Sequence, residues 1–199
     1  MTMIIKPAQP IHAQTACELI YQSGPVAFDF IFNKQHGPDI KVFLRHLFRT
    51  RRSMFSHKHH LVCLDKDEVV GTLGSFSLKS HKQTLLANAC AIFRQYGCKG
   101  VMKGIRFERE LVKPPKEDCL YLCHIAVEPS FQSKGIAGKL INQAALKAKE
   151  LGLNKLSLDV AQKNQRALNL YLSQGFKIIS IQNSYNSTLD NHIYMEKLL

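Results

Sequence analysis

The 199-residue chain lacks any apolar run close to the length of a membrane span. A helix that crosses a bilayer needs roughly 18 or more consecutive apolar residues, so we expect no membrane-spanning segment. Residues Met1 to Pro7 contain no long apolar region before a cleavage site. No signal peptide is therefore expected.

Acidic residues are scarce: 15 Asp and Glu stand against 27 Lys and Arg, a formal net charge of +12. Such an excess suits polyanionic partners. However, no nucleic-acid-binding motif accompanies the charge. A basic, solvated surface is the prediction, and a nucleic-acid partner is not expected. A basic RNA- or ribosome-associated protein stays open as an alternative.

Paired cysteine motifs are also missing. The six cysteines are scattered, mostly inside apolar periodic segments: Cys17, Cys63, Cys90, Cys98, Cys119 and Cys123. Buried, reduced thiols are predicted, and with them a cytoplasmic location. The tract from His57 to His60 resembles a metal-binding sequence in composition only, because it runs into a strand where neighbouring side chains point apart. We expect no metal.

The composition that remains is that of a globular protein, with 45 % hydrophobic residues. The length suits a single domain spanning residues 1–199. Its most informative stretch begins with an apolar, β-prone run from Tyr121 to Val127, which stops at Pro129. Residues Gln132 to Gly138 then lead directly into an amphipathic helix. The order is strand, small-residue loop, helix.

This loop is predicted to bind an anion. Backbone N–H groups at a helix start have no helical partner, and the helix dipole adds partial positive charge there. Phosphate is the most natural ligand for such a site. A Walker loop would need Gly and Ser or Thr where the chain has Ser133 and Leu140, and the dinucleotide fingerprint fails at Ala137 and Leu140.

A second motif follows. Asn164 is a good helix N-cap and Gly175 a good residue for the position after the helix. Between them, Asn164, Ala167 and Tyr171 recur at helical spacing and share one face. A polar, a small and a phenolic residue suit a ligand-binding face better than a core.

The two motifs together, Gln-x-x-Gly-x-Ala and Asn-x-x-Ala-x-x-x-Tyr-x-x-x-Gly-Phe, resemble the signatures of the GNAT superfamily of N-acetyltransferases. The resemblance is strong over residues 119–199 and covers the first 118 only in outline. It implies an α/β (α+β) fold, with a mixed, mostly antiparallel sheet flanked by helices. It also implies acetyl transfer from acetyl-coenzyme A to a primary amine, and Tyr171 as the general acid that protonates the departing thiolate.

By the same resemblance, the strand backbone pairs with the pantetheine arm, the loop holds the pyrophosphate and Asn164 contacts the arm. The expected cofactor contacts are Ile125, Ala126, Val127, Gln132, Ser133, Lys134, Gly135, Ile136, Ala137, Gly138, Asn164, Ala167 and Tyr171.

The general base is less defined. Family members that use a glutamate place it on the cofactor strand, but residues 120–127 contain no carboxylate. His124 is the titratable group there with a useful pKa, and Glu128 lies at the strand end. A water chain, or an amine that arrives neutral, is the alternative.

The N-terminal half fits the family plan. A helix is predicted over residues 11–22, and Phe28 and Phe30 are candidates for lining the acceptor pocket. A turn is predicted from His36 to Pro38, and Asp39 should cap a helix that follows. Residues 60–64 and 69–74 then form a β-hairpin.

About forty residues separate this hairpin from the cofactor strand, more than in many GNAT domains. Two helices are predicted in this insertion, at about 79–116. We expect this insertion to shape the acceptor site or to form a homodimer contact. A plain structural cover is the alternative. Residues 176–181 and 192–198 should form a terminal hairpin.

The sequence leaves the acceptor open between small-molecule and peptide amines. A coenzyme A-sensing module without turnover is the alternative function.

Overall fold

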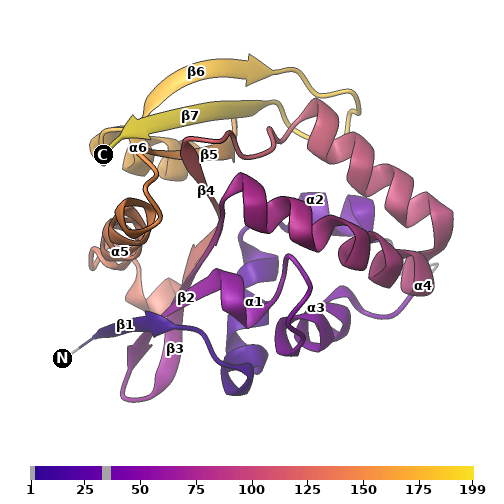
Figure 1. Ribbon diagram of the computed structural model, residues 1–199, viewed down its shortest axis with the longest axis horizontal. Helices are drawn as coiled ribbons and strands as arrows, with labels where there is room; N and C mark the ends of the chain where they lie inside the picture. Colours follow the sequence, from indigo (N-terminus) through magenta and orange to yellow (C-terminus); the bar gives the residue numbers. More distant parts are fainter. Residues whose placement is uncertain (1–2, 33–36) are drawn as a thin grey trace.

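The computed structural model describes residues 3–32 and 37–199. A seven-stranded sheet with the order β1-β2-β3-β4-β5-β7-β6 forms its centre (Figure 1). The strands are β1 (Ile4–Pro7), β2 (His60–Asp65), β3 (Glu68–Phe76), β4 (Cys119–Val127), β5 (Lys155–Ala161), β6 (Lys177–Gln182) and β7 (His192–Leu198). The β4–β5 pair is parallel and the five other pairs are antiparallel. The predicted hairpins, 60–64 with 69–74 and 176–181 with 192–198, are both confirmed.

Helices cover both faces of this sheet. The helices are α1 (Ala13–Gln22), α2 (Pro25–Ile31), α3 (Ile40–Arg49), α4 (Leu78–Glu110), α5 (Ile136–Glu150) and α6 (Gln165–Ser173). Alternation along β2 shows the two layers, since Val62 and Leu64 join the hydrophobic core with α1 and α3, while Leu61 and Cys63 join the core with α5. We call these the α1 face and the α5 face.

Local sequence signals account for several helix boundaries. Asp39 caps α3 as predicted, its carboxylate accepting from the Lys41 N–H at 2.8 Å. Asn164 caps α6 as predicted, and Gly175 follows that helix with a left-handed φ of 86°. The predicted turn at His36 lies outside the described residues.

The insertion is a single long element, α4, interrupted at Gly97. That glycine has φ 64° and ψ −169°, so the helical geometry breaks there. The two predicted helices correspond to the two halves. Figure 1 shows the second half turning back toward the β6–β7 connection.

The prediction of buried thiols is correct for Cys17, Cys63 and Cys119 but wrong for Cys90 and Cys98, which are exposed on α4. The outer side of α4 is apolar yet faces solvent, with Leu86 77 % exposed, so apolar periodicity there does not indicate burial. Within residues 3–32 and 37–199, none of the helices has both the length and the apolar character needed to cross a bilayer.

Candidate active site

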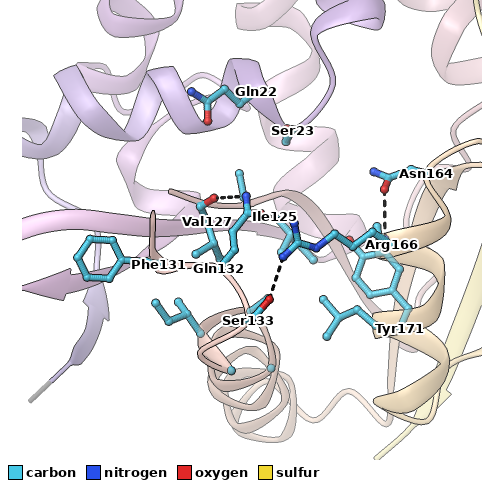
Figure 2. A pocket seen from close by; sticks show the side chains of 17 residues that line it. Gln22, Ser23, Ile125, Val127, Phe131, Gln132, Ser133, Asn164, Arg166 and Tyr171 are labelled. Atoms are coloured by element: carbon cyan, nitrogen blue, oxygen red, sulfur yellow. Dashed lines mark hydrogen bonds between the residues drawn. The ribbon is translucent and has the colours of Figure 1, made fainter. Parts of the chain in front are cut away.

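A cleft of about 420 Å³ opens where β4 and β5 separate (Figure 2). Their ladder ends at the pair Leu122–Leu158, so the β5-facing edge of the following β4 residues has no strand partner. The cleft is lined by Gln22, Ser23, Ile125, Ala126, Val127, Phe131, Gln132, Ser133, Gly135, Ile136, Ala137, Gly138, Asn164, Arg166, Ala167, Leu170 and Tyr171. Both sequence motifs therefore meet in one cleft.

The loop that starts α5 has the backbone of an anion site. Gly135 is the N-cap of α5 with a left-handed φ of 77°, and Ser133 has φ 62°. Left-handed residues beside a helix start turn successive N–H groups toward one side of the chain. The first turn of α5 contains no acidic residue, so nothing in that turn opposes a bound phosphate.

Gln132 and Arg166 support this loop from two directions. The Gln132 Nε2 donates to the Val127 carbonyl at 2.9 Å, which ties the loop to the end of β4. Arg166, from α6, donates through Nη1 to Gln132 Oε1 and through Nη2 to Ser133 Oγ at 3.2 Å. The sequence analysis missed Arg166, although it is the one cation between the two motif residues Asn164 and Tyr171.

The ligand-facing side of α6 is arranged as its spacing predicts. Asn164, Ala167 and Tyr171 all line the cleft. The Asn164 Oδ1 accepts from the Ala167 N–H at 3.1 Å, so this side chain caps the helix as well. Tyr171 is 7 % exposed and its ring packs edge-on against Phe176. Burial raises the pKa of Tyr171, which keeps the phenol protonated at neutral pH.

Some predicted residues lie elsewhere. Lys134 is not part of the cleft lining, and its Nζ lies 4.5 Å from the ring centroid of Phe131. Phe28 is buried in the α1-face core, 6.0 Å from the His124 ring. Phe30 packs against Tyr185 in the β6–β7 connection.

His124 lies on a β-bulge of β4 and not in the cleft lining. The register against β3 shifts between Thr72 and Gly74, and His124 takes up the extra residue with φ 51°. Its Nδ1 lies 3.1 Å from the Nε2 of His60. Burial lowers the pKa of His124 to about 4.

Asp159 is a carboxylate that the sequence analysis did not consider. It follows Leu158, the last β5 residue paired with β4. Its Oδ2 accepts from the Tyr121 hydroxyl at 3.1 Å and the Lys113 N–H at 3.2 Å, while its Oδ1 is buried without a described partner. Burial, only partly offset by these two bonds, raises the pKa of Asp159 to about 7. The residues of β4 give no sign of this carboxylate, because Asp159 lies on β5, the strand beside it.

The model of the acetyltransferase (GNAT) family matches residues 28–176. The chain belongs to this family. This chain is 39 % identical over 64 residues to the [ribosomal protein bS18]-alanine N-acetyltransferase of Haemophilus ducreyi, covering 32 % of this chain and 44 % of that relative. It is 31 % identical over 61 residues to the mycothiol acetyltransferase of Propionibacterium freudenreichii, covering 31 % of this chain and 20 % of that relative. The match thus spans less than half the length of either relative.

Solved structures show that this chain has the GNAT fold. An acetyltransferase crystal structure superposes with a TM-score of 0.71 at 19 % identity, covering 98 % of both chains. An N-acetyltransferase from Staphylococcus aureus gives 0.68 at 20 % identity, covering 98 % of this chain and 100 % of that one. The PaiA N-acetyltransferase from Thermoplasma acidophilum, solved with coenzyme A, gives 0.57 at 14 % identity over the whole of both chains. The predicted mixed, mostly antiparallel sheet flanked by helices is therefore confirmed.

Proposed function

We propose that this acetyltransferase moves an acetyl group from acetyl-coenzyme A to a primary amine by direct attack. The observation that carries the proposal is the single cleft that contains the anion loop, the unpaired edge of β4 and the Tyr171 phenol. A phosphorylated thioester fits these three features: its phosphates suit the anion loop, its extended arm suits the unpaired edge of β4, and its sulfur would then lie near the Tyr171 phenol.

The anion loop would hold the pyrophosphate. The N–H groups around Gly135 supply hydrogen bonds at the positive end of the α5 dipole. Arg166 adds a guanidinium that already reaches this loop. Beyond it, the backbone of Ile125, Ala126 and Val127 lines the cleft, as a strand-like pantetheine arm requires.

Tyr171 is the proposed general acid. In the reaction the amine nitrogen bonds to the thioester carbonyl carbon, the carbon–sulfur bond breaks, and the thiolate must take up a proton. A phenol that stays protonated in the cleft can donate it. General-acid help of this kind typically accounts for roughly 10² to 10⁴ in rate.

The attacking amine must also lose a proton, and Asp159 is the proposed acceptor. It lies where the strands separate, and its pKa of about 7 makes the carboxylate available near neutral pH. His124 is the rival acceptor, but its pKa of about 4 makes it a weaker base. A water chain as the proton acceptor, or an amine that arrives already neutral and needs no acceptor, is the remaining alternative.

The acceptor is a small-molecule or peptide amine. The two named relatives carry different acceptor names, a ribosomal-protein alanine and mycothiol, at similar identity. The segments that these two relatives share with this chain therefore do not decide between a small-molecule amine and a peptide amine.

Calorimetry with coenzyme A, followed by thiol release from acetyl-coenzyme A across a panel of amine acceptors, tests the proposal. We expect association with coenzyme A and thiol release that depends on the amine. Association without release for every acceptor class would instead indicate a coenzyme A-sensing module. No association would overturn the cofactor site itself.

A further inference from the structure

The sheet surface beneath the second half of α4 carries buried polar atoms that no described residue satisfies. They are Asp159 Oδ1 on β5, Gln182 Oε1 on β6, Tyr185 Oη in the β6–β7 connection and His192 Nδ1 on β7. The strand register places Asp159, Gln182 and His192 together, since Gln182 and His192 are directly paired and Asp159 is two residues from Ala161, the β5 partner of His192. Buried polar groups without partners are rare and costly. We call these four side chains the polar strip.

The insertion helix α4 covers the polar strip along its length. The Lys113 N–H, just past α4, donates to Asp159, and the Phe107 ring lies 5.6 Å from the His192 ring. One residue earlier on the helix, the Arg106 guanidinium lies 4.1 Å from the Tyr185 ring centroid. The insertion is therefore one wall of a polar region whose other wall is the sheet.

Helix α2 closes the outer end of this region. The Phe30 ring packs edge-on against Tyr185 at 6.3 Å. Lys103 donates from Nζ to the Phe30 carbonyl at 2.8 Å and lies over the Phe30 ring. The two phenylalanines proposed from sequence thus separate: Phe28 belongs to the core, and Phe30 lies at the entrance to this region.

The inner end of the polar strip lies beside the strand separation at which the cofactor cleft opens, although Asp159 is not itself part of the cleft lining. Asp159 is the first β5 residue beyond the ladder with β4, and the cleft opens at that separation. A molecule lying along the strip would therefore approach the gap between the strands with one of its ends.

Charge is distributed unevenly along this path. The inner end has the carboxylate of Asp159. The outer end has the cations Lys103 and Arg106, and Arg106 forms no ion pair with any described residue. The guanidinium carbon lies over the Tyr185 ring, and none of the hydrogen bonds among the described residues uses an N–H of Arg106, so these groups can bind a carboxylate in bidentate fashion.

We propose that the acceptor is a peptide whose N-terminal amine lies at Asp159 and whose acidic side chain, at its third or fourth residue, pairs with Arg106. This inference rests on the proposed acetyl transfer and names its substrate class. The separation of Arg106 from Lys113 is on the order of 10 Å, since α4 rises roughly 6 Å from Arg106 to its end at Glu110 and the Val112 N–H then bonds back to the Phe107 carbonyl. An extended peptide covers that distance in about three residues at roughly 3.3 Å each.

The direct test is binding, measured by fluorescence anisotropy with coenzyme A present. Three peptides share one sequence, a free N-terminus and a C-terminal dye, and carry Glu, Gln or Lys at the third and fourth positions. We expect the Glu peptide to bind about tenfold more tightly than the Lys peptide, since an unpaired guanidinium favours one charge and repels the other.

Charge reversal at Arg106 distinguishes binding at this site from nonspecific attraction to the basic surface. Arg106→Glu should reverse the order of the Glu and Lys peptides, and Arg106→Gln should remove the preference. Lys149→Glu, at an exposed position of α5 on the opposite face, makes the same change in net charge and should leave the order unchanged. Coenzyme A affinity of each variant reports whether it is folded.

Equal binding of the three peptides would overturn the inference. So would an effect of Lys149→Glu equal to that of Arg106→Glu, because the preference would then come from bulk charge. Thiol release is measured in parallel. Binding that depends on Arg106 without release would leave this peptide site standing and refute the acetyl transfer.

Discussion

His60 and His124 are joined through their imidazole rings, with 3.1 Å between His60 Nε2 and His124 Nδ1 and the ring planes parallel to within 5°. His60 Nδ1 lies 2.9 Å from the Ser56 carbonyl, which can only accept, so this nitrogen carries the proton. His60 Nε2 must then accept from His124 Nδ1. The neutral pair leaves the Nε2 of His124 unprotonated.

This pair predicts a loss of stability in acid. Burial lowers the pKa of His124 from 6.5 to about 4 and that of His60 well below 6.5. Between these values the unfolded chain binds protons that the folded chain does not, so the free energy of unfolding falls as the pH drops from about 6.5 toward 4. His124→Asn removes one titration while its amide can still donate to His60, and should flatten this dependence in urea unfolding measured across pH.

His46 supplies the matched control, because it is exposed on α3. His46→Asn should leave the slope between pH 4 and 6.5 as in the wild type. An equal change of slope in both variants would mean that the buried pair does not dominate acid sensitivity.

Tyr171→Phe should lower kcat by roughly 10² to 10⁴, the range for loss of a general acid. The ring contact with Phe176 does not involve the hydroxyl, so folding and coenzyme A affinity should stay near wild type. Thiol release under saturating acceptor, with calorimetry on the same sample, measures both. Unchanged turnover with a good acceptor would remove Tyr171 from this role.

The position of the acidic limb in the pH–rate profile should identify the proton acceptor. A carboxyl with a pKa of about 7 is neutral below that pH and cannot accept a proton, so kcat/KM should rise with pH and level off above 7 if Asp159 acts. Asp159→Asn should abolish this limb and most of the activity. Tyr121→Phe removes a hydrogen bond to the carboxylate and should move the limb to higher pH. A limb near pH 4 that His124→Asn removes would favour His124 instead.

Gly135→Ala should weaken coenzyme A binding through the backbone of the loop. Gly135 has φ 77°, and a Cβ there would meet nothing within 4 Å, so the substitution strains the left-handed conformation without a clash. Such strain costs about 1 kcal/mol in stability. Gly152 has φ 70° and equally free space after α5. Gly152→Ala should therefore cost the same stability and leave affinity intact; equal losses of affinity would argue against a cradle at Gly135.

Arg166→Gln should also weaken coenzyme A binding, because the guanidinium that reaches Gln132 and Ser133 is lost while the helix is kept. A charged hydrogen bond contributes about 1.5 to 3 kcal/mol, which corresponds to a decrease of roughly 10- to 100-fold. The effect should persist with dephospho-coenzyme A, which keeps the pyrophosphate, and should shrink with a phosphate-free analogue. The same loss for a phosphate-free analogue would show that Arg166 acts on the loop and not on phosphate.

The sequence determined the features that depend on neighbours along the chain. Asp39, Asn164 and Gly175 mark helix boundaries by their own side chains or backbone freedom, and the cleft contains both motifs because each is a continuous segment. The fold class was expected from the resemblance to the GNAT superfamily, which rests on these two local motifs.

Only the tertiary structure decided which distant groups meet. Arg166 reaches Gln132 across 34 positions, Tyr121 reaches Asp159 across 38 and His60 reaches His124 across 64. Each pair depends on strand order, on a β-bulge or on the placement of α6, none of which leaves a local pattern in the sequence. The turn at Gly97 likewise brings Arg106 over Tyr185. The anion loop could be predicted because it is local, whereas the proposed proton acceptor and the proposed acceptor-binding surface arise from packing between elements.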